Sequence, residues 1–178
     1  ESYKNKYLFR GQANKDWNIS PSIFRNKIDL ENEAKSLNNA IKNSGDNILT
    51  TLFKLQHYGN PTRLLDLTIS PLSALFFTID DLTQVNNDGV IYVIDKSKSY
   101  SLESEEINLF SEFLIKENIN NLDIISGFSE DEAIKVLTRD YIIEYGYNFS
   151  YTNQRAILQG GTALIFGFEI FEDKLVRK

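Results

Sequence analysis

The spacing of apolar residues along the chain predicts several amphipathic helices. In residues 46–57, Ile48, Leu49 and Leu52 recur at helical intervals. Asp46 can cap the start of this helix, and Gly59 is well placed to end it. Similar patterns predict helices over residues 31–43, 104–117 and 129–145, and Ser129 to Glu132 has the form of a capping box at the start of the last one.

Two serine–proline pairs mark further helix starts. Proline is well tolerated at the first helical position, and serine is a good cap before it. Ser20-Pro21 and Ser70-Pro71 both have this form. After the second pair, four large apolar residues follow at helical spacing, and we expect them to be buried. They are Leu72, Leu75, Phe76 and Ile79.

Extended segments alternate with these helices. Residues 5–9 have the pattern of a short strand that runs into Arg10-Gly11, and residues 61–68 are extended. β-Branched residues over 90–94 follow a turn signal at 87–89. Side chains alternate again over 163–170. This order predicts an α+β fold, a single compact domain with a small mixed or antiparallel sheet flanked by helices.

Composition excludes several kinds of chemistry. The 178 residues include no cysteine, which removes disulfides, thiol catalysis and thiolate metal ligands. His57 is the one histidine, so a zinc site would need it together with carboxylates alone, an uncommon ligand set. We therefore expect no metal.

The charge is uneven along the chain. The net charge of -6 argues against a partner held by phosphate neutralisation, so we expect no duplex nucleic acid. Residues 1–66 hold 10 Lys/Arg against 7 Asp/Glu, whereas residues 100–144 hold 3 against 11. A small anionic ligand would therefore meet the first third of the chain or its last motif, and the acidic stretch is interpreted as a solvated helical face.

The location follows from what the sequence lacks. No apolar run has the length needed to span a bilayer, and the first residues do not have the pattern of a signal peptide. We expect a cytoplasmic protein that does not contact a membrane. The chain begins with Glu1 instead of methionine, which favours a piece of a longer protein.

The first polar cluster is Phe9-Arg10-Gly11-Gln12. An arginine at a strand end, with glycine next to it, lets the guanidinium reach a ligand without a neighbouring side chain in the way. Such a fork suits a phosphate or a carboxylate. A structural salt bridge is the alternative interpretation of Arg10.

The second cluster runs from Gln56 to Asp66 and brings together His57, Tyr58 and Arg63. Two leucines before Asp66 indicate buried chain, where charges are costly unless they are paired. One hypothesis is an Arg63–Asp66 ion pair that joins helix to strand. The other is a pocket lined by His57, Tyr58 and Arg63, with Asp66 orienting one of them.

The third cluster contains Arg155, Gln159 and the pair Gly160-Gly161. Two glycines before a strand permit close backbone approach, or they form a bulge or turn. The spacing of dinucleotide-binding and P-loop glycines is absent.

Together these residues resemble the FRG domain family of bacterial and phage proteins. The resemblance rests on Phe9-Arg10-Gly11, the Gln56 to Asp66 block, Thr68, Pro71 with Ala74, Arg155, and Gln159-Gly160. It implies that residues 1–178 form one FRG domain, with a helical insert at about 100–146. Leu67 departs from the tryptophan that family members often have, and we expect this change to affect packing only.

The order of these parts is similar to that of ADP-ribosyltransferases that begin with a strand arginine, an analogy of layout. It implies that Arg10 grips NAD and that Thr68 supports the nicotinamide ribose. Gly11, Gln12, Tyr58, Arg63 and Arg155 are the other candidate ligand-binding residues. His57, Asp66 and Gln159 are the candidate catalytic residues. Gln159 stands where those enzymes have a glutamate, so the negative charge would have to come from another carboxylate such as Asp66.

The leading hypothesis is therefore an NAD-binding, ADP-ribosyltransferase-like effector of a bacterial toxin or phage-defence system, acting on a macromolecular target that the sequence does not identify. Whether the domain is an enzyme stays open. The alternative is a non-catalytic sensor or protein-interaction module that uses the same pocket. A nuclease that holds magnesium through Asp66 and other carboxylates is a third hypothesis, and a buried polar network that only fixes the fold is a fourth.

Overall fold

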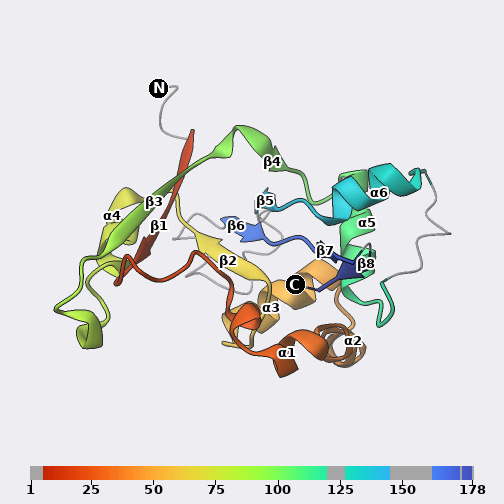
Figure 1. Ribbon diagram of the computed structural model, residues 1–178, viewed down its shortest axis with the longest axis horizontal. Helices are drawn as coiled ribbons and strands as arrows, with labels where there is room; N and C mark the ends of the chain where they lie inside the picture. Colours follow the sequence, from red (N-terminus) through yellow and green to blue (C-terminus); the bar gives the residue numbers. More distant parts are fainter. Residues whose placement is uncertain (1–5, 120–126, 145–161, 173, 178) are drawn as a thin grey trace. The chain divides into compact units, whose positions relative to one another are not determined.

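The computed structural model describes residues 6–119, 127–144, 162–172 and 174–177, and it confirms the α+β class (Figure 1). Contacts between residues divide the chain into two compact units. Unit 1 contains Glu1–Ser20, Leu65–Tyr100 and Ile142–Leu164, and unit 2 contains Pro21–Leu64, Ser101–Tyr141 and Ile165–Lys178. Among the residues described, no helix combines the length and the apolar content that a membrane crossing requires.

Unit 1 contains an antiparallel strand pair and a helix packed on it. Strand β1 (Tyr7–Gln12) pairs with β3 (Val90–Asp95) along its whole length. Helix α4 (Pro71–Phe77) packs against β1, and the Ser70 side chain caps the helix by accepting a hydrogen bond from the Ser73 amide. The 3₁₀ helices η2 (Leu82–Gln84) and η3 (Lys96–Lys98) precede and follow β3.

A second sheet has the strand order β2-β6-β5-β4, and most of its residues belong to unit 1. Its strands are β2 (Leu64–Leu67), β4 (Ser99–Tyr100), β5 (Tyr141–Glu144) and β6 (Thr162–Ile165). Strands β4 and β5 are parallel. Leu8, Leu67 and Ile142 form an apolar core, which Ile94 and Leu164 extend.

Unit 2 is mainly helical. Its elements are η1 (Ser22–Arg25), α1 (Lys27–Glu31), α2 (Glu33–Ser44), α3 (Ile48–His57), α5 (Glu105–Leu114), α6 (Glu130–Leu137), and the hairpin of β7 (Glu169–Phe171) and β8 (Lys174–Val176). Helix α2 packs against α3, and α5 packs against α6. The buried ring of Phe110 contacts those of Tyr141 and Phe168, with centroids 5.5 and 5.4 Å apart.

The helices predicted over 31–43, 46–57 and 104–117 are confirmed as α2, α3 and α5. The cap of α3 differs, because the Asn47 side chain accepts the hydrogen bond from the Thr50 amide at 2.8 Å. Asp46 instead forms an ion pair with Lys54 at 2.7 Å. Gly59 follows the helix with a φ of 79°, a left-handed conformation that suits glycine.

Three predicted elements are shorter or of another kind. Ser20-Pro21 leads into the 3₁₀ helix η1 instead of an α-helix. The helix predicted over 129–145 begins with the expected capping box but ends at Leu137, and Tyr141–Glu144 is strand β5. The strand predicted over 163–170 is divided between β6 and β7.

The chain leaves the sheet between β6 and β7 because its backbone finds other partners there. The Gly167 amide donates to the Asp140 carboxylate at 2.8 Å, and the Phe168 amide donates to the Leu137 carbonyl at 2.8 Å. A Cβ on Gly167 would lie 2.7 Å from the Arg139 carbonyl oxygen. The crossing is therefore too close for any residue larger than glycine.

The predicted burial of the apolar residues in and just after α4 is wrong. Leu72, Phe76 and Ile79 are 75%, 53% and 69% exposed, and Leu75 is 50% exposed. The inward side of the helix carries Ala74, which is fully buried. Helix α4 lies so close to β1 that only a small residue fits between them, so the large ones point away from the strand.

Candidate functional site

Arg10 lies within strand β1, which continues through Gly11 to Gln12 instead of ending at the arginine. Its Nη1 donates a hydrogen bond to the backbone carbonyl of Asp66 at 2.9 Å. The residue is partly buried, and both partners belong to unit 1. A contact over 56 residues of sequence thus fixes the direction of the guanidinium.

Thr68 joins the same place through the backbone. The Phe9 amide donates to the Thr68 carbonyl at 2.7 Å, and the Thr68 amide donates to the Phe9 carbonyl at 2.9 Å. The buried Thr68 hydroxyl accepts the Ser70 amide at 3.1 Å, next to the cap of α4. Arg10, Asp66 and Thr68 are therefore neighbours along the chain's fold in unit 1.

Gly11 serves helix packing. A Cβ at this position would lie 1.8 Å from the Ala74 carbonyl oxygen and 3.2 Å from the Thr78 methyl. The glycine therefore allows the backbone of α4 to approach β1. The space next to Gly11, which was predicted to leave access to a ligand, is filled by the helix.

Gln12 is also held within the unit. It is 7% exposed, and its side-chain amide donates to the Trp17 carbonyl at 3.2 Å. We infer that this hydrogen bond holds the loop after β1 in place.

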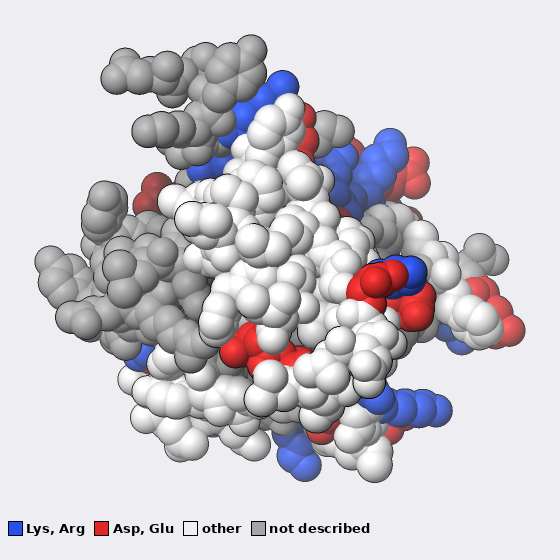
Figure 2. All heavy atoms as spheres, turned by 90° about the vertical axis from the view of Figure 1, so that its left-hand side faces the viewer, with Lys and Arg blue, Asp and Glu red and all other residues white. Residues whose placement is uncertain are grey.

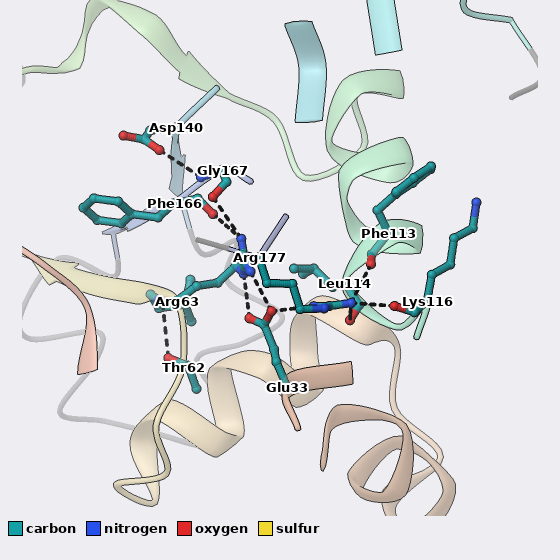
Figure 3. Close-up of polar contacts among 11 residues, drawn as sticks. Glu33, Thr62, Arg63, Phe113, Leu114, Lys116, Asp140, Phe166, Gly167 and Arg177 are labelled. Atoms are coloured by element: carbon teal, nitrogen blue, oxygen red, sulfur yellow. Dashed lines mark hydrogen bonds and ion pairs between the residues drawn. The ribbon is translucent and has the colours of Figure 1, made fainter. Parts of the chain in front are cut away.

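Arg63, of the same sequence block as Asp66, lies in the interior of unit 2 (Figure 3). It is 0% exposed, and its Nε donates to one oxygen of Glu33 at 2.6 Å while Nη2 donates to the other. Its Nη1 donates to the carbonyls of Phe166 and Gly167 at 2.7 and 3.1 Å. The ion pair proposed with Asp66 is thus formed with Glu33, and we assign Arg63 a structural role.

Arg177 completes this buried cluster. Its Nη1 donates to Glu33, and its Nη2 donates to the carbonyls of Phe113, Leu114 and Lys116 at the end of α5 (Figure 3). The Phe168 ring lies 4.4 Å from the Arg63 guanidinium carbon and 5.5 Å from that of Arg177. One carboxylate therefore meets two guanidinium groups beside an aromatic face.

The pKa of Glu33 reflects this setting. Burial alone raises it, but the charges and hydrogen bonds of Arg63 and Arg177 together outweigh burial and hold the pKa below its usual value of 4.5. Glu33 is therefore ionised at neutral pH. Sequence reasoning missed Glu33 and Arg177. The position of Glu33 beside Ala34 and Leu37 on the inner side of α2 was a usable signal, whereas nothing marked Arg177.

His57 and Tyr58 lie at the end of α3 in unit 2. Both are exposed, Tyr58 by 77%, and their ring centroids are 5.4 Å apart. The Thr62 hydroxyl donates to the Gln56 side chain nearby, and the Thr62 amide donates to the Ser22 hydroxyl at 3.3 Å. These contacts order the chain between α3 and β2.

Arg155 and Gln159 lie outside the described residues, so their approach to Arg10 stays a prediction. Within the part of the chain that is described, no three His, Asp or Glu side chains are grouped as a metal site would require. In the described residues of unit 1, the Asp66 carbonyl holds the Arg10 guanidinium in place, and a cationic group of this kind suits an anionic ligand better than a cation.

Comparison with known proteins finds one family whose model matches the first half of the chain. Residues 5–87 match the model of the FRG domain. No curated protein and no solved structure matches the chain. The match includes Arg10, Asp66 and Thr68 of unit 1 and also His57, Tyr58 and Arg63 of unit 2.

Proposed function

The chain carries an FRG domain in residues 5–87, and from this premise we propose that Arg10, Asp66 and Thr68 bind NAD for an ADP-ribosyltransferase-like reaction. The observation that supports it most is the hydrogen bond from the Arg10 guanidinium to the Asp66 carbonyl. It orients a fork that suits a diphosphate, because a guanidinium can pair with two phosphate oxygens at once.

Thr68 and Asp66 supply the other groups that such a reaction needs. The Thr68 hydroxyl is held next to the first turn of α4, where it can support a ribose. In the transfer, the bond between ribose C1′ and nicotinamide breaks, the acceptor bonds to C1′, and nicotinamide leaves. Positive charge develops on the ribose, and the exposed Asp66 carboxylate is the group proposed to stabilise it. His57 and Gln159 stay as further catalytic candidates.

Calorimetry with NAD tests the binding step. We expect Arg10→Ala to weaken NAD binding roughly tenfold to a hundredfold, since hydrogen bonds to charged groups contribute about 1.5–3 kcal/mol. Arg25→Ala is the matched control, because Arg25 is an exposed arginine of η1 in unit 2 and its loss changes the charge equally. Absence of NAD binding to the unmodified chain, or equal binding by the Arg10 variant, contradicts the proposal.

Release of nicotinamide separates an enzyme from a ligand sensor. With a candidate acceptor present, the unmodified chain should release nicotinamide. The Asp66→Asn variant should still bind NAD through Arg10 and Thr68 but should release nicotinamide far more slowly. NAD binding without any release would favour the sensor instead.

We further propose that this activity serves a bacterial toxin or defence system. Production of the chain in bacteria should then slow growth, and Arg10→Ala should restore it. Equal growth inhibition by the Arg10 and Arg25 variants would separate toxicity from the proposed site.

A further inference from the structure

Arg10 has an aromatic neighbour on strand β3. The antiparallel register places Tyr92 directly opposite Arg10. Opposite residues of an antiparallel pair project to the same side, with their Cβ atoms about 4.5–5.5 Å apart. Tyr92 therefore lies beside Arg10 on one side of the strand pair, and both residues belong to unit 1.

This side of the pair, which we call the Arg10 side, has one cation and one aromatic ring. Side chains alternate along a strand, so the register assigns six residues to it. They are Leu8, Arg10 and Gln12 of β1 and Val90, Tyr92 and Ile94 of β3. Leu8 and Gln12 are buried, whereas Arg10 and Tyr92 in the middle are only partly buried. The accessible part of the Arg10 side therefore includes both the guanidinium group and the ring.

The other side of the strand pair offers no cation to a ligand. It is the side on which α4 packs, over Gly11. Its residues are Tyr7, Phe9, Gly11, Ile91, Val93 and Asp95. Figure 2 looks from the side of Figure 1 that carries α4 and β3, and charged residues are sparse over the middle of that surface. An anionic ligand of this strand pair would therefore bind on the Arg10 side.

We propose that the Tyr92 ring stacks on the base of a nucleotide whose phosphate is bound by Arg10. This inference rests on the proposed function for the phosphate-binding role of Arg10. A guanidinium group pairs with phosphate oxygens, and an aromatic ring accepts the flat face of any base. One ribose separates phosphate and base in a nucleotide, so partners on neighbouring strands, about 4.8 Å apart, suit the two groups. Tyr92 then makes the site select nucleotides over other phosphate compounds.

Neither the sequence motifs nor the family match selects Tyr92. It follows the matched segment 5–87 and lies within a strand of valine and isoleucine. Only the pairing of β3 with β1 brings it next to Arg10. The structure therefore adds to the candidate site a residue that the sequence indicates only as part of a strand.

Calorimetry with NAD and with ADP tests this role. Tyr92→Ala should weaken the binding of both roughly fivefold to a hundredfold, the effect of removing one stack between a base and an aromatic ring. Tyr92→Phe keeps the ring and should bind nearly as the unmodified chain does, whereas Tyr92→Leu keeps apolar bulk without the ring and should bind weakly. Tyr7→Ala is the matched control and should bind normally, because Tyr7 belongs to the same strand pair but projects to the other side.

A spectroscopic measurement keeps the proposal testable if Tyr92→Ala does not fold. In a chain with isotope-labelled tyrosine rings, the NMR signal of Tyr92 is the one that Tyr92→Phe removes. Binding of ADP should shift this signal, because the stacked base lies over the ring, and should leave the Tyr7 signal in place. A Tyr92 signal that saturating ADP does not move contradicts the stacking.

The outcomes of calorimetry separate this inference from the proposed function. NAD binding that Tyr92→Ala and Tyr92→Leu leave unchanged overturns the role of Tyr92 and leaves that of Arg10 in place. ADP binding that depends on Tyr92, without any NAD binding, supports the role of Tyr92 and contradicts the NAD reaction. Binding of neither nucleotide by the unmodified chain contradicts both.

Discussion

At the scale of single residues, the glycine of the Phe9-Arg10-Gly11 motif and its arginine do different things. Arg10 directs a guanidinium to the Asp66 carbonyl, whereas Gly11 makes room for the backbone of α4. We expect Gly11→Ala to lower the free energy of unfolding by about 3 kcal/mol, the upper end of overpacking effects. The reason is that the new methyl would meet a backbone oxygen, which cannot rotate away as a side chain can.

Urea unfolding measures this change, and Gly45→Ala is its comparison. Gly45 has a φ of 70° with no atom within 4 Å of the added Cβ, so its substitution strains the backbone without any clash. We expect a loss of about 1 kcal/mol there. An equal loss at the two positions would mean that packing against α4 does not explain Gly11.

Glu33 is the second residue whose loss should be severe. Glu33→Gln keeps the shape of the side chain but leaves Arg63 and Arg177 buried without a counter-charge, which typically costs about 3–5 kcal/mol. Urea unfolding at neutral pH should show this loss. Asp46→Asn is the control, since it breaks an ion pair with Lys54 at the surface and should change stability little.

The same cluster predicts a pH dependence. Because the pKa of folded Glu33 lies below its usual value of 4.5, the folded state binds the proton less readily than the unfolded state. The stabilisation is complete above that value and is lost as pH falls through the lower folded pKa. Unfolding free energy measured downward from pH 5 should therefore fall more steeply for the unmodified chain than for Glu33→Gln, and parallel curves would contradict this role.

At the scale of elements, the sequence predicts which segments are helical better than it predicts which side is buried. The spacing of Leu72, Leu75 and Phe76 correctly indicates a helix, but burial depends on how closely β1 approaches, which the spacing does not encode. The helix predicted over 129–145 fails at Leu137 because tertiary pairing makes Tyr141–Glu144 a strand.

The candidate site was predictable to a similar degree. The resemblance to the FRG pattern selected Arg10, Asp66 and Thr68, and the structure brings them together in unit 1, while their role in ligand binding stays a prediction. The predicted partner of Arg63 was Asp66, which is close in sequence. The observed partner is Glu33, which is close only in the folded structure. Contacts over 30 and 144 residues, such as those of Glu33 with Arg63 and Arg177, leave no local signal.

The Arg177 side chain, which is distant in sequence, holds the last turn of α5. Arg177 follows β8 and binds three carbonyls at the end of the helix, where a cation is also favoured by the helix dipole. We expect Arg177→Ala to speed amide hydrogen exchange in β7, β8 and the last turn of α5. Arg177→Lys should restore it only in part, because lysine keeps the charge but not the fork. Unchanged exchange in Arg177→Ala would show that α5 and β8 do not depend on this side chain.

At the scale of the whole molecule, the matched family segment makes structural contacts with residues outside it. Residues 5–87 contain β1, β2 and α4, but β6, the neighbour of β2, comes from Thr162–Ile165. Strand β3, which pairs along all of β1, begins at Val90. The carbonyls of Phe166 and Gly167 that satisfy the buried Arg63 are also outside the segment.

We therefore expect residues 5–87, produced alone, to lack a cooperative fold. The edge of β1 that pairs with β3 and the edge of β2 that pairs with β6 would be left unpaired. The buried guanidinium of Arg63 would also lose two of its hydrogen-bond acceptors, and an unsatisfied buried donor costs free energy. Thermal melting followed by circular dichroism should show a broad, shallow change for the segment and a single sharp transition for the 178-residue chain. A sharp transition for the segment would mean that the FRG match is an independent folding unit and that the residues after 87 were added to it.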